Sequence, residues 1–297
     1  MTQSTTAEVI DDTDIAARDQ AFDEALAAAN NDLPEIEEEA PLGSASDGWR
    51  TFALDIWITD LNSYEFGIYR HSRNRAKTRQ FSSDMDIIAE VKEDGRRTGV
   101  VAYREDLWKQ KSGMDRRLVL RLFSDKLNWR ATMDLLIGRS LQLTVGARGI
   151  PITAYAINLH VDKTVIYLER SANKWPVLPE NFSFFVVRDG KPFYYRLRHD
   201  FFSVGGDYTL YDEAGRKVGH LDGRLFSLGG YWTGKVRADH ADNKLMSVMK
   251  LFAASVGFNS ACRRHIKRLW KDLRAGKIEP KLERYEAEYY LNPRRVR

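Results

Sequence analysis

The feature that most restricts how this chain can fold is an apolar run near its C-terminus, Leu245–Phe258. Its only clearly polar residues are Ser247, Lys250 and Ser255, so a helix over this run has no polar face. Such a helix must be surrounded by protein or by lipid. Fourteen residues at about 1.5 Å each span roughly 20 Å, which is less than the roughly 30 Å hydrocarbon layer of a membrane. The run therefore predicts a helix enclosed by protein, and Gly257 is the predicted stop.

Short segments rich in aromatic and β-branched residues precede this run, and they recur roughly every 10 to 15 residues. That texture favours a barrel or sandwich over βαβ units. Asp-Gly steps at 94–95 and 189–190 predict hairpins, because glycine tolerates the positive φ of such turns. Turns are also predicted at 212–215 and 221–224, and residues 128–136 fit either a strand or a short helix. The predicted strands are 51–58, 64–69, 85–91, 98–104, 117–123, 141–145, 152–157, 164–168, 182–187, 193–197, 208–211, 217–221 and 225–228.

Strands that lead directly into a helix without a polar face indicate a sheet wrapped around that helix. The predicted fold class is mainly β with α: a closed antiparallel β-barrel around a central hydrophobic C-terminal helix, with a peripheral basic helix after it. The predicted organisation is an acidic N-terminal tail over 1–46, a barrel domain over 47–259 whose central helix covers about 243–257, and a basic amphipathic helix with an aromatic and basic tail over 260–297.

The net charge of +4 hides a strong asymmetry along the chain. Residues 1–49 hold thirteen Asp or Glu and one base, Arg18, which leaves about +16 for the remainder. Acidic, aromatic-poor segments bury too little apolar surface to offset chain entropy, so most of residues 1–46 is predicted to be disordered, with a short helix near 19–30. Two roles for this tail stay open: a solubilising extension, or a segment that competes with an anionic ligand for a basic surface.

A second helix is predicted over Ala261–Ala275, with Ser260 as its N-cap. Its apolar residues fall at i, i+3, i+4 and i+7 and form one stripe. Bases fill the other faces against a single acid, Asp272. Such a helix is typical of a membrane interface or of an anionic partner, although the stripe also suits docking on the barrel. The candidate lipid- or anion-binding residues are Arg263, Arg264, Lys267, Arg268, Trp270, Lys271 and Arg274.

A secondary basic patch follows the second predicted strand. Aromatic residues flank it thinly, so it offers little of the stacking platform expected of a nucleic-acid site. The aromatic residues of the C-terminal tail suit packing either on the barrel or on a partner chain. The residues of the secondary patch are Arg70, Arg73, Arg75, Lys77 and Arg79.

The region from Phe193 to Phe258 resembles the C-terminal half of the LURP-one-related and tubby-like superfamily, which includes the phospholipid scramblases. The matching texture is Tyr195–Ser203, then Asp207–Gly229, then the apolar helix. The resemblance covers about a quarter of the chain and implies a twelve-stranded barrel around that helix. The basic second helix departs from the family pattern. A tubby-type phosphoinositide pocket has no residue-by-residue match here, and a scramblase-like acidic calcium segment is absent from the sequence.

No pattern in the sequence argues for an enzyme. The six histidines form no H-x-x-x-H or H-E-x-x-H pair, so no metal site or cofactor is predicted. The glycine pairs match neither a Walker loop nor a dinucleotide fingerprint. The single cysteine, Cys262, excludes an internal disulfide and is interpreted as packing filler. Neither a secretory signal nor a run long enough to span a membrane is recognised, so cytoplasmic residence is expected.

Basic density is therefore the functional lead. The favoured prediction is a non-enzymatic, tubby-like binding barrel, cytoplasmic or peripheral at the inner membrane face, that associates with anionic phospholipid. The alternative is a structural or adaptor subunit that docks a protein partner or a second copy through its C-terminal segment. A third alternative is an enzyme or a nucleic-acid binder built on the barrel.

Overall fold

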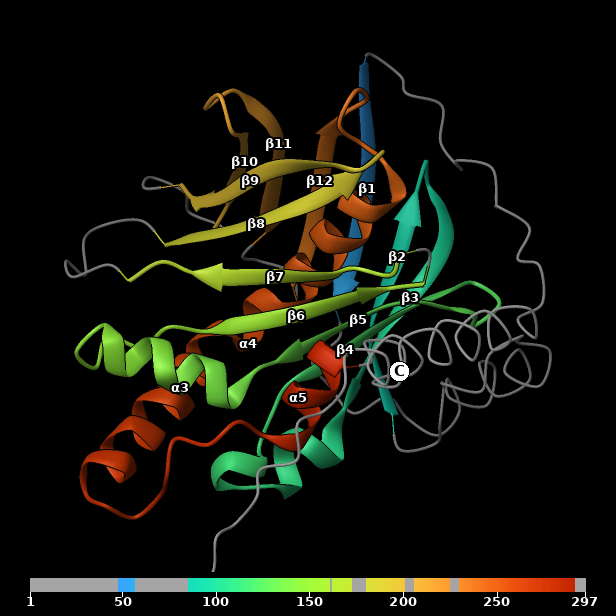
Figure 1. Cartoon of the computed structure of the whole chain (residues 1–297). Helices are drawn as coiled ribbons and strands as arrows, with labels where there is room; N and C mark the ends of the chain where they lie inside the picture. The colour runs from blue at the N-terminus through green and yellow to red at the C-terminus, as the bar shows by residue number, and fades with distance from the viewer. Residues whose placement is uncertain are drawn as a thin grey trace, which may run out of the picture. The chain divides into compact units, whose positions relative to one another are not determined.

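The structure is a computed structural model that describes residues 48–56, 85–160, 162–172, 180–200, 206–224 and 230–291. The predicted strands at 64–69 and 225–228 lie outside these residues, as does the acidic tail. So does the secondary basic patch of Arg70, Arg73, Arg75, Lys77 and Arg79. Within the described part, twelve strands form the protein's sheet (Figure 1). The strands are β1 (Trp49–Ile56), β2 (Met85–Glu93), β3 (Arg96–Arg104), β4 (Val119–Ser124), β5 (Trp129–Leu135), β6 (Ala154–Leu159), β7 (Val165–Arg170), β8 (Asn181–Arg188), β9 (Lys191–His199), β10 (Tyr208–Asp212), β11 (Lys217–Arg224) and β12 (Tyr231–Arg237).

The sheet is a closed antiparallel barrel in which each strand pairs with its neighbours in the sequence. The first and last strands close it, with Trp49 opposite Arg237 and Asp55 opposite Tyr231. Alternation along the strands sends one set of side chains inward: β8, for example, has Phe182, Phe184 and Val186 buried between more exposed neighbours. The predicted closed antiparallel barrel is confirmed.

Two of the predicted hairpins are confirmed by their backbone angles. Asp94 and Gly95 have φ of 49° and 74°, and the Asp189-Gly190 step has 48° and 74°. Positive φ at both central residues is the type I′ turn, whose twist matches that of the flanking strands. The predicted turn at residues 221–224 is wrong, because all four residues lie within β11 and pair with β12. Residues 128–136, left open by the sequence, form β5.

The barrel encloses the first half of one long helix, α4, which runs for 32 residues over Asn243–Arg274 (Figure 1). Asp242 caps its start by accepting a hydrogen bond from the Leu245 N–H at 2.7 Å. Between Leu245 and Ser255 nearly every side chain is buried. Each large aliphatic or aromatic side chain enclosed in this way contributes about 1.5–3 kcal/mol. The predicted central hydrophobic helix is therefore confirmed.

The predicted stop at Gly257 is wrong, because α4 continues through it without a break and the central and basic helices are one element. A glycine within a helix costs about 1 kcal/mol relative to alanine. Burial of Cys262, Ile266 and Leu269 beyond it outweighs that cost. Gly257 has no positive φ and its surroundings leave open space at its Cα.

Lys250 is the buried charged residue in the enclosed half of α4, and a buried acid of the barrel wall lies beside it. Its ammonium group pairs with Glu93 of β2, which also accepts a hydrogen bond from Arg50 at 3.1 Å. Burial would raise the pKa of Glu93, but the two cations outweigh burial and hold it below its ordinary value. The pair fixes the rotation of α4 about its own axis, because Lys250 reaches the Glu93 carboxylate in only one orientation of the helix.

The described part also contains α3 (Ile137–Gly146), α5 (Arg284–Leu291) and two short helical turns, Asp106–Gln110 and Gly113–Asp115. The strand predicted at residues 141–145 is wrong, because these residues belong to α3. Their alternation of apolar and polar residues is short enough to suit either element. Leu141 and Thr144, three residues apart, are both buried, which is helical spacing.

The aromatic residues near the C-terminus pack on the barrel through α5. The Tyr289 hydroxyl donates to Asp134 Oδ2 at 3.1 Å. The Glu286 carboxylate accepts the N–H groups of Gly138 and Arg139, at 2.6 and 3.0 Å, and so caps the start of α3. Burial raises the pKa of Asp134 to about 6, although Arg117 acts in the opposite direction. The last described residues, Tyr290 and Leu291, are exposed.

Candidate anion-binding site

The second half of α4 emerges from the barrel as an amphipathic helix (Figure 1). Cys262, His265, Ile266 and Leu269 are buried on one side at spacings of three and four residues. At about 100° per residue, the bases from Arg263 to Arg274 fall within an arc of roughly 140° on the other side. The buried stripe docks the helix, so both parts of the sequence prediction, a docked stripe and a basic outer face, describe this segment.

Four of the seven candidate residues are exposed: Arg264, Arg268, Lys271 and Arg274. None of them has a carboxylate partner among the residues that the structure describes. Arg264 donates a hydrogen bond to Ser260 Oγ at 2.7 Å, and Arg274 lies 5.1 Å from the Trp270 ring centroid. These four residues, termed here the basic face, therefore retain charges that a bound anion would meet directly.

The remaining three candidate residues are held by contacts within the protein. Arg263 pairs with Glu180 at 3.4 Å. Lys267 donates to the Gly149 carbonyl at 2.5 Å and lies 4.3 Å from the centroid of the Trp270 ring. The Trp270 indole is half-buried against Gly149, in the turn after α3. Trp270 therefore helps to dock α4, and its part in lipid or anion binding stays a prediction.

The turn that receives Trp270 is shaped by backbone as well as by side chains. Arg148 and Gly149 have φ of 54° and 88°. A Cβ at residue 149 would overlap the indole, so the close approach requires glycine. Arg148, which the sequence did not single out, is exposed beside this contact. It carries a further positive charge one residue before Gly149, whose carbonyl accepts the hydrogen bond from Lys267.

Buried groups beneath the basic face are uncharged. Burial lowers the pKa of His265 to about 4, and its Nε2 lies 3.1 Å from the carbonyl of Arg116, to which the neutral ring donates. Burial raises the pKa of the Cys262 thiol to about 12, so it remains protonated. A protonated, enclosed thiol is a poor nucleophile, which agrees with the packing role predicted for Cys262.

The described residues include no group of three or more His, Cys, Asp or Glu side chains placed to hold a metal ion. By length and composition alone α4 is apolar enough to cross a membrane, but 67 % of its apolar window is buried inside the protein. Enclosure by the barrel accounts for that hydropathy.

A second group of exposed bases lies on β9, where the sequence prediction identified none. Tyr194, Arg196 and Arg198 alternate along this strand and therefore share its outer face. The sequence could have identified these residues through their spacing of two, because every second residue of a barrel strand faces outward.

Comparison with known proteins identifies no relative: no family model, no curated protein and no solved structure matches the chain. The fold is a twelve-stranded closed antiparallel barrel, within the described residues, around a long buried helix. That architecture agrees with the one implied by the tubby-like resemblance.

Proposed function

We propose that this protein is a non-enzymatic binding barrel of the tubby-like kind, which associates with anionic phospholipid at the inner face of a membrane. The observation that carries the proposal is the basic face of α4, whose four exposed bases lack carboxylate partners among the described residues. Bases near an anionic surface each contribute about 1 kcal/mol. Four of them together give about 4 kcal/mol.

The geometry of α4 supports this role because one element supplies both anchor and contact. Its first half is fixed in the barrel by enclosure and by the Lys250–Glu93 pair. Its second half is docked by His265, Ile266 and Trp270. The backbone that carries the basic face is therefore already fixed in the free protein. Little conformational entropy is lost when lipid binds.

Vesicle co-sedimentation tests the proposal. The protein is expected to bind vesicles of phosphatidylcholine and phosphatidylserine, to bind pure phosphatidylcholine weakly, and to lose binding as salt is raised. Neutralising the basic face, with Arg264→Gln, Arg268→Gln, Lys271→Gln and Arg274→Gln together, is expected to weaken binding by roughly 1,000-fold, the equivalent of about 4 kcal/mol.

A control of equal charge separates a site from a general effect of net charge. Four exposed bases elsewhere on the barrel are changed together to glutamine: Arg96, Lys126, Lys163 and Lys217. This control is expected to bind nearly as well as the natural protein. Equal losses in the two variants would contradict a site on α4.

The adaptor alternative makes a different prediction for the same proteins. A partner chain, or a second copy, that docks on the C-terminal segment would contact the exposed Tyr290 and Leu291. Light scattering on the natural protein and on Leu291→Asp separates the cases. A stable dimer that dissociates in this variant, with no vesicle binding, would replace the lipid proposal.

A further inference from the structure

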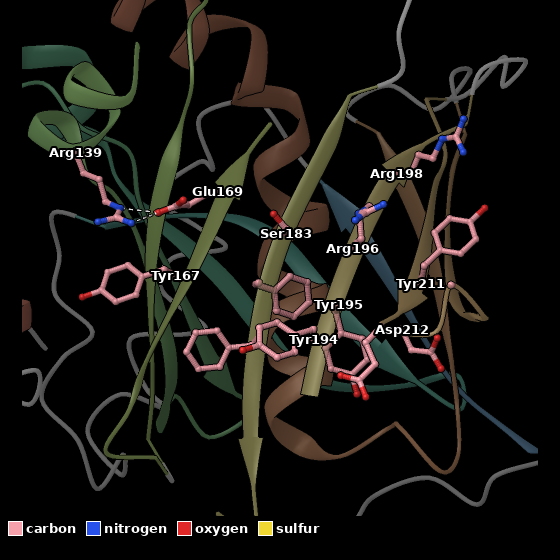
Figure 2. Close-up of a pocket in the computed structure, with 14 residues that line it drawn as sticks. Arg139, Tyr167, Glu169, Ser183, Tyr194, Tyr195, Arg196, Arg198, Tyr211 and Asp212 are labelled. Carbon is pink, nitrogen blue, oxygen red and sulfur yellow. Dashed lines mark hydrogen bonds and ion pairs between the residues drawn. The ribbon is translucent and has the colours of Figure 1, made fainter. Parts of the chain in front are cut away.

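A groove on the outer wall of the barrel crosses β7, β8, β9 and β10 and encloses about 640 Å³ (Figure 2). It exists because β7 and β8 pair only at Glu169–Ser183 and Arg170–Phe182, whereas β6 and β7 pair along five residue positions. Figure 1 shows β7 and β8 diverging beyond their short pairing. The volume lies within the range of small-ligand sites, roughly 300–1,000 Å³.

Aromatic rings line this groove on each of the four strands. On its open side, Phe185 and Tyr194 lie 5.8 Å apart between ring centroids and are 37 % and 54 % exposed. Tyr167 stands on the β7 side and Tyr211 on the β10 side (Figure 2). Exposed large rings gathered on a sheet face are a stacking surface for flat ligands.

Two guanidinium groups accompany the rings. Arg196 and Arg198 are exposed on β9 and have no ion pair or side-chain hydrogen bond within the described residues. Arg139, at the opposite end of the groove, pairs instead with Glu169, as the dashed line in Figure 2 shows. A planar guanidinium matches the geometry of phosphate and also stacks on rings. The guanidinium groups of β9 are therefore the charges that an anion in the groove would meet; of the acids on the β10 side of the lining, Asp212 is paired with Arg216, and Glu213 is exposed.

We infer that this groove binds a nucleotide, with the base stacked on Tyr194 or Phe185 and the phosphate held by Arg196 and Arg198. A flat bilayer contacts protruding residues, whereas a groove admits a ligand narrow enough to enter it. The rings by themselves would bind any flat apolar molecule. The two arginines favour a flat molecule that also carries an anionic group. This site is independent of the proposed lipid contact on α4, because the two share no residue.

Binding measured by calorimetry with four probes tests the inference on the full chain. Adenosine 5′-monophosphate contains both the ring and the phosphate, adenosine contains only the ring with its sugar, and inorganic phosphate contains only the anion. A site that uses both features binds the monophosphate at least tenfold more tightly than either fragment. An eight-residue single-stranded oligonucleotide is the fourth probe.

The oligonucleotide distinguishes two sources of the same chemistry. Affinity well above that of the monophosphate identifies a single-stranded chain as the ligand, and equal or lower affinity identifies a free nucleotide. Either result supports the inference. Absence of saturable binding by both, or a monophosphate affinity no greater than that of inorganic phosphate, overturns it.

Variants locate the binding in the groove. Arg196→Gln and Arg198→Gln are each expected to lower affinity for the monophosphate about tenfold, and Tyr194→Leu is expected to lower it while Tyr194→Phe, which keeps the ring, restores it. Arg96→Gln, an exposed base on β3, is the matched control and is expected to bind normally. If the two β9 variants lose vesicle binding and bind the monophosphate normally, the groove is a lipid contact and the inference fails.

Discussion

Gly149 shows how a single residue sets the docking of a whole helix half. Its φ of 88° is strained for any other residue, and its missing side chain makes room for Trp270. Gly149→Ala is expected to lower the free energy of unfolding by about 2 kcal/mol or more, from backbone strain and overlap together. Urea unfolding measures this.

Gly146 is the matched control for that experiment. It ends α3 with open space around its Cα and no positive φ. Gly146→Ala is expected to leave stability unchanged or to raise it by about 0.5–1 kcal/mol, because alanine is the better helix former. Similar losses from the two substitutions would show that the Trp270 contact does not hold α4.

His265 gives the protein a predictable acid response. Because burial lowers its pKa from 6.5 to about 4, the unfolded chain binds a proton more readily than the folded one. Its contribution to stability is complete above pH 6.5 and is lost as the pH falls through 4, by up to about 3 kcal/mol. His265→Gln, which retains a hydrogen-bond donor, is expected to flatten this acid loss in urea unfolding at pH 7, 5.5 and 4. Parallel curves would exclude His265 as the cause.

At the scale of elements, α5 completes α3 although the two are far apart in the sequence. The first N–H groups of a helix have no partner within it, and here Glu286 accepts two of them. Glu286→Ala is expected to cost about 1–3 kcal/mol, because it leaves the buried Gly138 N–H and the part-buried Arg139 N–H unpaired. Thermal unfolding measures this, with Leu291→Ala as the exposed control on the same helix. An unchanged melting temperature for Glu286→Ala would show that the cap contributes nothing.

For the molecule as a whole, β1 is the strand that closes the barrel, because it pairs with both β2 and β12. The chain divides into Met1–Leu42 and Gly43–Arg297, and β1 pairs with β2 and β12 within the second unit. Removal of residues 1–42 is expected to leave the barrel's unfolding transition in place. Removal through Ile56 is expected to abolish it, because two ladders are lost together. Circular dichroism on heating distinguishes these outcomes, and loss of the transition in the shorter deletion would mean that the tail takes part in the fold.

Local patterns in the sequence were sufficient for the features that depend on local chemistry. The type I′ turns at Asp94-Gly95 and Asp189-Gly190 follow from two adjacent residues, and the enclosed helix follows from the lack of any polar face over Leu245–Phe258. A strand that alternates reveals which side chains face outward once it is known to be a strand. The exposed arginines of β9 were predictable in that limited sense.

The order of residues alone is enough to predict that strands enclose a C-terminal helix, because a helix that is apolar on every side must be surrounded by protein or lipid. Three features become visible only in the folded chain: α4 continues through Gly257, residues 141–145 are helical, and α5 caps α3. Each of these depends on a partner distant in the chain: packing by Cys262, Ile266 and Leu269, or acceptance of two N–H groups by Glu286. The groove also required the fold, since it arises where β7 and β8 separate, and strand separation leaves no mark in either strand alone.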